Sequence, residues 1–257
     1  MEITKRSYSD TFTIAWRCLL LSRRNPETFL TSILLPALMM LLFVALFDGL
    51  VHVGGASYTA YIVPGVLIQC AAQGSSTTAV MVNQDITSGV MSRLSTLPVR
   101  QRSLLSGHVL EACGRSLVTS AVVLLIALLL GFRPAFSLTG LGISLLLLSG
   151  MILALSWMAV TVGILSKSPQ GASSLSSLAI VFPYLSSGFV PTEHLPPLLR
   201  TFAQHQPMTP VIDSLRAALA GHPADMGLLA AAFLWCILLS SVFYAASVLL
   251  LRKKLHG

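Results

Sequence analysis

The sequence predicts an all-α integral membrane protein with six transmembrane helices, and its composition and the spacing of its apolar stretches are the main reasons. The chain has 257 residues, of which 54% are hydrophobic and only 10% are charged. Its mean hydropathy is +0.81. Because a soluble domain carries about 25% charged residues, this chain lacks the polar residues needed to cover a core in water. We expect one membrane domain over residues 1–257.

The positions of the basic residues predict the orientation of these helices. Twelve of the sixteen lysines and arginines fall in segments that must share one side of the membrane, and these are Lys5, Arg6, Arg17, Arg23, Arg24, Arg93, Arg100, Arg102, Lys167, Arg252, Lys253 and Lys254. Short basic segments stay in the cytoplasm, so both termini are expected inside. The basic residues flank apolar stretches and form no groove-like cluster, so nucleic acid is not an expected partner.

The N-terminal part predicts an interfacial helix followed by the first span. Over residues 7–24, aromatic and apolar residues share one helical face and polar residues the other. This spacing favours a helix that lies in the membrane interface, although an ordinary cytoplasmic helix remains the alternative. Residues 29–47 are long enough to cross a hydrocarbon core of about 30 Å.

The second span, residues 58–82, is polar in its latter half. Gln69, Gln73, Ser76 and Thr77 are prominent among its polar side chains. Two interpretations remain open for this face. Small and polar residues let helices pack closely in a membrane, and the same stripe could line a substrate path.

The third and fourth spans are expected over residues 104–131 and 138–165. Glu111 and Arg115 lie four residues apart on the third span, in the order that favours an ion pair within a helix. An unpaired arginine inside a membrane is costly. The two residues therefore predict either a structural pair near the inner rim or a relay of motion from the cytoplasmic loop.

The C-terminal part predicts two more spans with an irregular segment between them. Residues 170–189 are rich in small residues and are expected to form a helix buried in the bundle. Prolines interrupt residues 190–222, which predict two short helices at the outer surface or dipping into the membrane. The last span is expected over residues 227–251.

Motifs of enzymatic chemistry are missing from the sequence. It has no G-x-x-x-x-G-K-[ST], H-E-x-x-H or G-x-S-x-G pattern, so we expect no enzyme, no cofactor and no metal site in this chain. The four cysteines are scattered and read as apolar residues of helices. The six histidines lack ligand spacing and are expected to be solvated or interfacial.

One cytoplasmic segment predicts a short amphipathic helix over residues 85–97. Ile86, Val90, Arg93 and Leu97 share one helical face, and Pro98 stops the helix. Such a helix between two spans is a docking surface for a cytoplasmic partner. An ordinary interfacial connector is the alternative.

This segment also carries a family resemblance. Asp85, Gly89, Arg93, Leu94 and Pro98 are spaced as in the acidic-Gly-Arg-Leu-Pro signature of type-2 ABC exporter permeases, and the chain resembles the daunorubicin-resistance-like drug and antibiotic export permeases. A second group of residues is similar to the family's outer segment, and these are Gly188, Phe189, Pro191, Pro196, Pro207 and Arg216. The resemblance covers nearly the whole chain in order.

The resemblance implies a fold and a mechanism. Residues 7–24 would be an elbow helix, residues 85–97 a coupling helix, and residues 190–222 two re-entrant helices. Asp85, Gly89, Arg93, Leu94 and Pro98 would contact a separate ABC ATPase subunit, present in two copies, which binds ATP and Mg²⁺.

A second permease, identical or a paralogue, would complete an exporter of drugs, antibiotics or lipids in a bacterial inner membrane. Asp85 departs from the family pattern, in which this position is often Glu, but the charge is kept. The rival is a secondary transporter or channel subunit driven by an ion gradient, for which only Glu111 comes close to a suitable mid-membrane group.

Overall fold

The computed structural model is helical throughout the part of the chain that it describes, which is residues 2–23, 26–48, 57–95, 101–135, 137–192, 196–223 and 225–256. No strand occurs in these ranges. The elements are α1 (Glu2–Arg23), α2 (Pro26–Phe47), α3 (Tyr58–Thr87), α4 (Val90–Ser95), α5 (Gln101–Leu129), α6 (Leu138–Leu165), α7 (Pro169–Ser177), η1 (Leu178–Ile180), α8 (Val181–Tyr184), α9 (Pro197–His205), α10 (Met208–Ala220) and α11 (Met226–His256).

Four helices among the described residues are long and apolar enough to cross a membrane. They are α2, α5, α6 and α11, with apolar stretches of 19, 28, 28 and 29 residues. The helix α3 has 30 residues, but the polar face predicted for residues 69–77 lies in its middle. The prediction of membrane helices is thus confirmed for four segments.

The helix α3 occupies the centre of the bundle. It packs against α2, α5, α6, α7 and α10, while α11 packs along α6 and α1 along α5. Tyr58, Val66, Ile68 and Ala72 of α3 are buried in the apolar clusters between these helices. Because α3 contacts most other elements, a displacement of either of its ends reaches most of the bundle.

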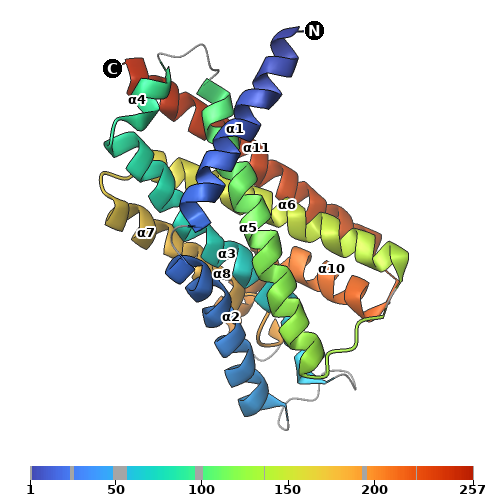
Figure 1. Ribbon diagram of the computed structural model, residues 1–257. Helices are drawn as coiled ribbons and strands as arrows, with labels where there is room; N and C mark the ends of the chain where they lie inside the picture. The colour runs from blue at the N-terminus through green and yellow to red at the C-terminus, as the bar shows by residue number, and fades with distance from the viewer. Residues whose placement is uncertain are drawn as a thin grey trace.

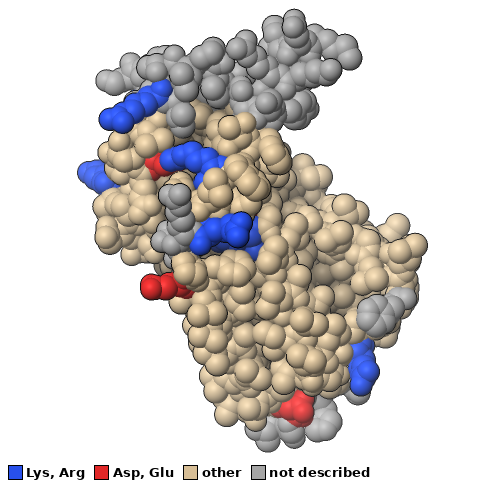
Figure 2. Space-filling model, in the orientation of Figure 1, with Lys and Arg blue, Asp and Glu red and all other residues tan. Residues whose placement is uncertain are grey.

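The two ends of the bundle differ in charge. The N-terminus, α4 and the C-terminal turns of α11 lie together at the top of Figure 1, whereas the C-terminal ends of α2 and α5 lie at the bottom. On the face drawn in Figure 2, lysine and arginine gather mainly in the upper part, and most of the surface below is uncharged. We call the end that holds α4 and the C-terminal turns of α11 the basic end.

Residues 170–189 do not form the single helix that the sequence predicted. The α-helix α7 passes through the 3₁₀ turn η1 into the short α8 and ends at Tyr184. Pro183 has no N–H group for a helical bond, and its carbonyl oxygen accepts a hydrogen bond of 2.5 Å from the Ser186 hydroxyl. The chain then leaves the helix, and Gly188 and Phe189 lie outside any helix. Two short helices follow within 190–222, namely α9 and α10.

Two glycines bring this non-helical segment against α3. A Cβ atom added to Gly65 would lie 2.5 Å from the carbonyl oxygen and 2.7 Å from the Cα of Gly188. Both neighbouring atoms belong to the backbone, so no side-chain rotation relieves the clash. The close approach of α3 to residues 186–189 therefore requires glycine at position 65.

We predict that Gly65→Ala destabilises the protein by about 1–3 kcal/mol, the range for overpacking a tight core. The matched control is Gly142→Ala, because a Cβ atom at Gly142 on α6 meets nothing within 4 Å. Thermal unfolding in detergent checks the pair, with a lowered midpoint expected for Gly65→Ala alone. Equal midpoints for the two variants would contradict the close backbone contact.

Candidate coupling site at the basic end

An ion pair joins α1 to the end of α3. The guanidinium of Arg17 donates two hydrogen bonds to the Asp85 carboxylate, from Nη1 to Oδ2 at 2.7 Å and from Nη2 to Oδ1 at 2.9 Å. This two-pronged geometry is the strongest form of the arginine–carboxylate interaction. His108 of α5 adds a third contact, with Nε2 3.2 Å from Asp85 Oδ2. Three helices thus meet at one carboxylate.

The surroundings of Asp85 keep it ionised. Its side chain is only 11% exposed, and burial by itself would raise the pKa of this carboxyl group. The hydrogen bonds from Arg17 and His108 favour the charged form more strongly, so the pKa of Asp85 lies below its usual range. In turn, the hydrogen bond to Asp85 raises the pKa of Arg17.

Close packing reinforces this junction. A Cβ atom at Gly107 of α5 would lie 2.4 Å from Ile14 Cγ2 of α1, so the two helices touch where the glycine leaves space. Cys18 is fully buried, and its Sγ lies 3.5 Å from His108 Nδ1. Ile14 and Cys18 belong to an apolar cluster that also contains Met91 of α4. The helix α1 is therefore packed into the bundle through one face.

A second set of hydrogen bonds holds the end of α3 from the opposite side. Asn83 Nδ2 donates to the carbonyl oxygens of Gly163 at 3.0 Å and Ser166 at 2.7 Å, which lie at the C-terminal end of α6. Lys254 Nζ of α11 donates to the Ile164 carbonyl oxygen at 2.9 Å. The last turns of α3 are thus fixed to α6 by Asn83 and to α1 and α5 by Asp85.

The helix expected over residues 85–97 is divided in the structure. The helix α3 continues to Thr87, and Gly89 has a φ of +73°, in the left-handed region that favours glycine. A new helix, α4, starts at Val90, so the predicted continuous face of Ile86, Val90 and Arg93 is broken. On α4, Met91 is buried and Arg93 is exposed.

The coupling residues predicted from the sequence therefore occupy different environments. Arg93 lies at the surface of the basic end, whereas Asp85 is held by residues of its own chain. Gly89 forms the turn between them. The side chain of Leu94, residues 96 and 97, and Pro98 lie outside the described residues.

Glu111 and Arg115 form the predicted ion pair within α5. Arg115 Nε donates to Glu111 Oε1 at 3.0 Å, and the two side chains are only 4% and 1% exposed. Arg115 Nη2 also donates to Thr78 Oγ1 at 2.9 Å and to the Gly74 carbonyl oxygen at 3.3 Å, both on α3. These bonds join α5 to the middle of α3, which favours the structural interpretation of the pair.

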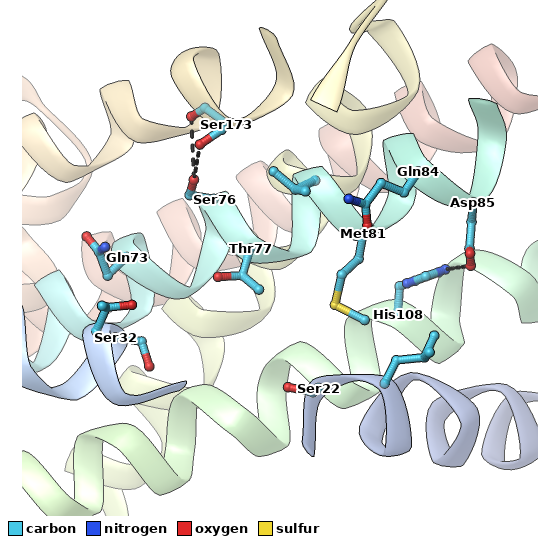
Figure 3. Close-up of a pocket in the computed structure, with 13 residues that line it drawn as sticks. Ser22, Ser32, Gln73, Ser76, Thr77, Met81, Gln84, Asp85, His108 and Ser173 are labelled. Carbon is cyan, nitrogen blue, oxygen red and sulfur yellow. Dashed lines mark hydrogen bonds and ion pairs between the residues drawn. The ribbon is translucent and has the colours of Figure 1, made fainter. Parts of the chain in front are cut away.

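The polar face of α3 serves two purposes. Gln69 is fully buried, and its Nε2 donates to the Tyr184 hydroxyl group, so this residue packs helices together. Gln73, Ser76 and Thr77 line a cavity of about 490 Å³ bounded by α1, α2, α3, α5 and α7. Of these, Ser76 also packs helices together, because its Oγ lies 3.1 Å from Ser173 Oγ of α7. In Figure 3, Gln73, Thr77 and Met81 follow one face of α3 and lie opposite Ser32 and Ser22.

The structure brings together only some of the residues of the predicted outer motif. Arg216 Nη2 donates to the Ser187 carbonyl oxygen at 2.6 Å, and its guanidinium carbon lies 4.0 Å above the Tyr61 ring. The Tyr58 hydroxyl group donates to the Phe189 carbonyl oxygen at 2.8 Å. Residues 187–189, including Gly188, are thereby tied to α3 and α10.

Two of the three prolines of the outer motif, Pro196 and Pro207, have a different role, because they border helices. Pro196 precedes α9, Pro207 precedes α10, and Pro191 lies in the segment after α8. The φ angles of Pro196 and Pro207, −53° and −66°, are compatible with the beginning of a helix, where the missing N–H group costs nothing.

Two residues of the coupling site were missed by the sequence analysis. The expectation that the histidines are solvated or interfacial is wrong for His108, whose side chain is 2% exposed and faces Asp85. A signal was present, because Leu104, His108, Glu111 and Arg115 share one helical face of α5. Arg17 was placed on the polar side of the first helix, but nothing in its spacing indicated its distant partner.

We predict that Arg17 and Asp85 are energetically coupled. A double-mutant cycle with Arg17→Ala, Asp85→Ala and the double variant should give a coupling free energy of about 0.5–3 kcal/mol, as for residues in direct contact. Thermal or denaturant unfolding of the purified protein provides the measurement. Strictly additive effects of the two substitutions would contradict the junction described above.

Comparisons with known proteins agree with this architecture. Residues 9–220 match the model of the ABC-2 type transporter family. The chain is 28% identical over 224 residues to the daunorubicin resistance ABC transporter permease protein DrrB1 of Streptomyces coeruleorubidus, which covers 86% of this chain and 79% of that protein. It is 30% identical over 207 residues to the probable doxorubicin resistance ABC transporter permease protein DrrC of Mycobacterium tuberculosis. This match covers 78% of this chain and 73% of the relative. This chain therefore belongs to the ABC-2 type transporter family and is a transmembrane ABC transporter permease.

Proposed function

We propose that this chain is the membrane subunit of an ATP-driven exporter of hydrophobic or amphipathic molecules, which works with a separate ATPase subunit. The names of its relatives, which refer to daunorubicin and doxorubicin resistance, support drug-like substrates. The chain has no P-loop, so ATP and Mg²⁺ would be bound by two copies of the partner ATPase. The permease itself would not be an enzyme.

The observation that carries this proposal is the construction of the segment between α3 and α5. Arg93 of α4 is exposed at the basic end, while Met91 anchors the same helix in the apolar cluster beneath it. A protein that binds α4 would push on the last turns of α3, which directly precede α4. There, Asn83 is fixed to α6, and Asp85 is fixed to α1 and α5. A local displacement would thus reach most of the bundle.

This proposal includes a topology. The basic end would face the cytoplasm, because positively charged segments stay inside. With α1 at the interface, six segments would cross the membrane: α2, α3, α5, α6, the α7–η1–α8 segment and α11. The organisms of the relatives favour a bacterial inner membrane. A second permease, the same chain or a paralogue, would complete the transporter.

The rival function is a secondary transporter or channel subunit. It would use Glu111 as the ionisable group that binds the driving ion. That carboxylate is 1% exposed and accepts a hydrogen bond from Arg115 at 3.0 Å, and a group held in an ion pair is poorly suited to bind and release protons or cations. The geometry therefore favours the ATP-driven mechanism.

We predict that Arg93→Glu abolishes co-purification with the ATPase subunit and ATP-dependent transport, because it reverses the charge at the docking surface. Membrane insertion should stay unchanged, since Arg93 is exposed. The measurement is pull-down of the ATPase from membranes, followed by ATP-driven uptake of a fluorescent amphiphile into inverted vesicles.

Arg133→Glu is the matched control, because Arg133 is also exposed but follows α5 at the opposite end of the bundle. It should leave both readouts intact. Normal ATPase capture by Arg93→Glu would contradict the proposed docking surface. Transport by the purified chain without any ATPase would instead support the secondary transporter.

A further inference from the structure

The cavity beside α3 is lined mainly by uncharged polar side chains. Most are hydroxyl or amide groups, namely those of Ser22, Thr31, Ser32, Gln73, Ser76, Thr77, Gln84 and Ser173. None of the described lining residues is a lysine or arginine, and the apolar ones are Leu21, Val80 and Met81. Its volume of about 490 Å³ falls within the range of about 300–1,000 Å³ typical of small-molecule sites.

The charged group at one end of the cavity is already balanced. Asp85 lines the cavity, but Arg17 binds both of its carboxylate oxygens at 2.7 and 2.9 Å, and His108 contacts it as well. An anionic headgroup would meet this carboxylate, and the basic groups beside it are already engaged. Arg17 binds Asp85, and His108, which also lines the cavity, contacts Asp85 through Nε2 and Cys18 through Nδ1. A cationic headgroup would have to compete with Arg17. Because burying an unpaired charge is costly, neither kind of ion suits the cavity.

The Gln73 side chain lines the other end of the cavity, and a small turn of its amide group presents an oxygen that needs a hydrogen-bond donor. The side-chain oxygen of Gln73 is buried and has no hydrogen-bond partner among the described residues. A buried polar atom without a partner costs free energy, which a ligand recovers when it donates a hydrogen bond. The hydroxyl group of Thr77, one turn further along α3, can donate or accept.

We propose that this cavity binds the polar end of the transported amphiphile, and that this polar end is uncharged and carries hydroxyl or amide groups. A donor of the ligand bonds to Gln73 Oε1, and further hydroxyl groups exchange hydrogen bonds with Thr77 and Ser32. The apolar part of the ligand lies against Leu21, Val80 and Met81. This assignment rests on the proposed export function and specifies the substrate class.

The test uses three fluorescent probes that share one decyl chain and one fluorophore but differ in their headgroups, namely glucoside, trimethylammonium and phosphate. The full-length chain, with whatever subunits co-purify, is reconstituted in phosphatidylcholine nanodiscs, and binding to empty nanodiscs is subtracted. We expect saturable binding of the glucoside probe that is at least tenfold tighter than binding of either ionic probe.

Two cavity variants and one control test whether Gln73 and Thr77 bind the ligand. Gln73→Leu and Thr77→Val should each weaken glucoside binding about 5- to 10-fold, as expected for the loss of one hydrogen bond. Ser149→Ala removes a half-buried hydroxyl group of α6 that bonds to the Leu145 carbonyl oxygen of its own helix and does not line the cavity, and this variant should bind normally. Elution profiles and unfolding midpoints establish that each variant is folded.

Several results would overturn the assignment. They are equal binding of the three probes, tighter binding of an ionic probe, or unchanged glucoside binding by both cavity variants. These outcomes leave the export function standing if the wild-type chain still captures its ATPase. Failure of that capture would refute the proposed function, whatever the probes show.

Discussion

The bidentate bond between Arg17 and Asp85 is the interaction on which the organisation of the basic end depends. It joins residues 68 positions apart in the sequence and fixes an amphipathic helix to the end of the central helix α3. Without it, α1 would be attached to the bundle mainly by its contacts with α5. With it, α1, α3 and α5 meet at one ionised carboxylate, to which His108 also binds.

Under the proposed function, this junction would allow a push on the short helix α4 to reach the long helix α3. The chain turns at Ser88 and Gly89, shortly after the two anchoring residues Asn83 and Asp85. A force on α4 therefore acts on a short, hydrogen-bonded turn and not on a flexible loop. The same turn ends close to the cavity, because Gln84 and Asp85 line it. Movement of α4 would thus change the shape of the proposed ligand site.

The elements that could be predicted from the sequence are those set by local composition. The long apolar helices follow from runs of hydrophobic residues, and the fourth predicted span matches α6 at Leu138–Leu165. The pairing of Glu111 with Arg115 followed from their spacing of four residues on one helix. Each of these features is encoded within a few turns of chain.

The features that could not be predicted depend on distant residues or on single backbone angles. Arg17 and Asp85 meet only because α1 packs on α5 at Gly107. The division of residues 85–97 depends on the positive φ of Gly89, which hydrophobic periodicity does not reveal. The close approach of the segment after α8 to α3 likewise depends on Gly65, which lies against the backbone of Gly188, 123 positions away in the printed sequence. Gln69 and Gln73 looked equivalent in sequence, and only their neighbours separate a packing residue from a cavity residue.

The most direct test of the account is photo-crosslinking from position 93 in intact membranes. A photoreactive amino acid is placed at Arg93, with position 133 as the control, and the captured partner is identified by mass spectrometry. The account predicts that position 93 captures an ABC ATPase subunit, in an amount that changes with ATP, and that position 133 does not. Capture of only lipid or no partner at position 93, by a transporter that remains active, would contradict it.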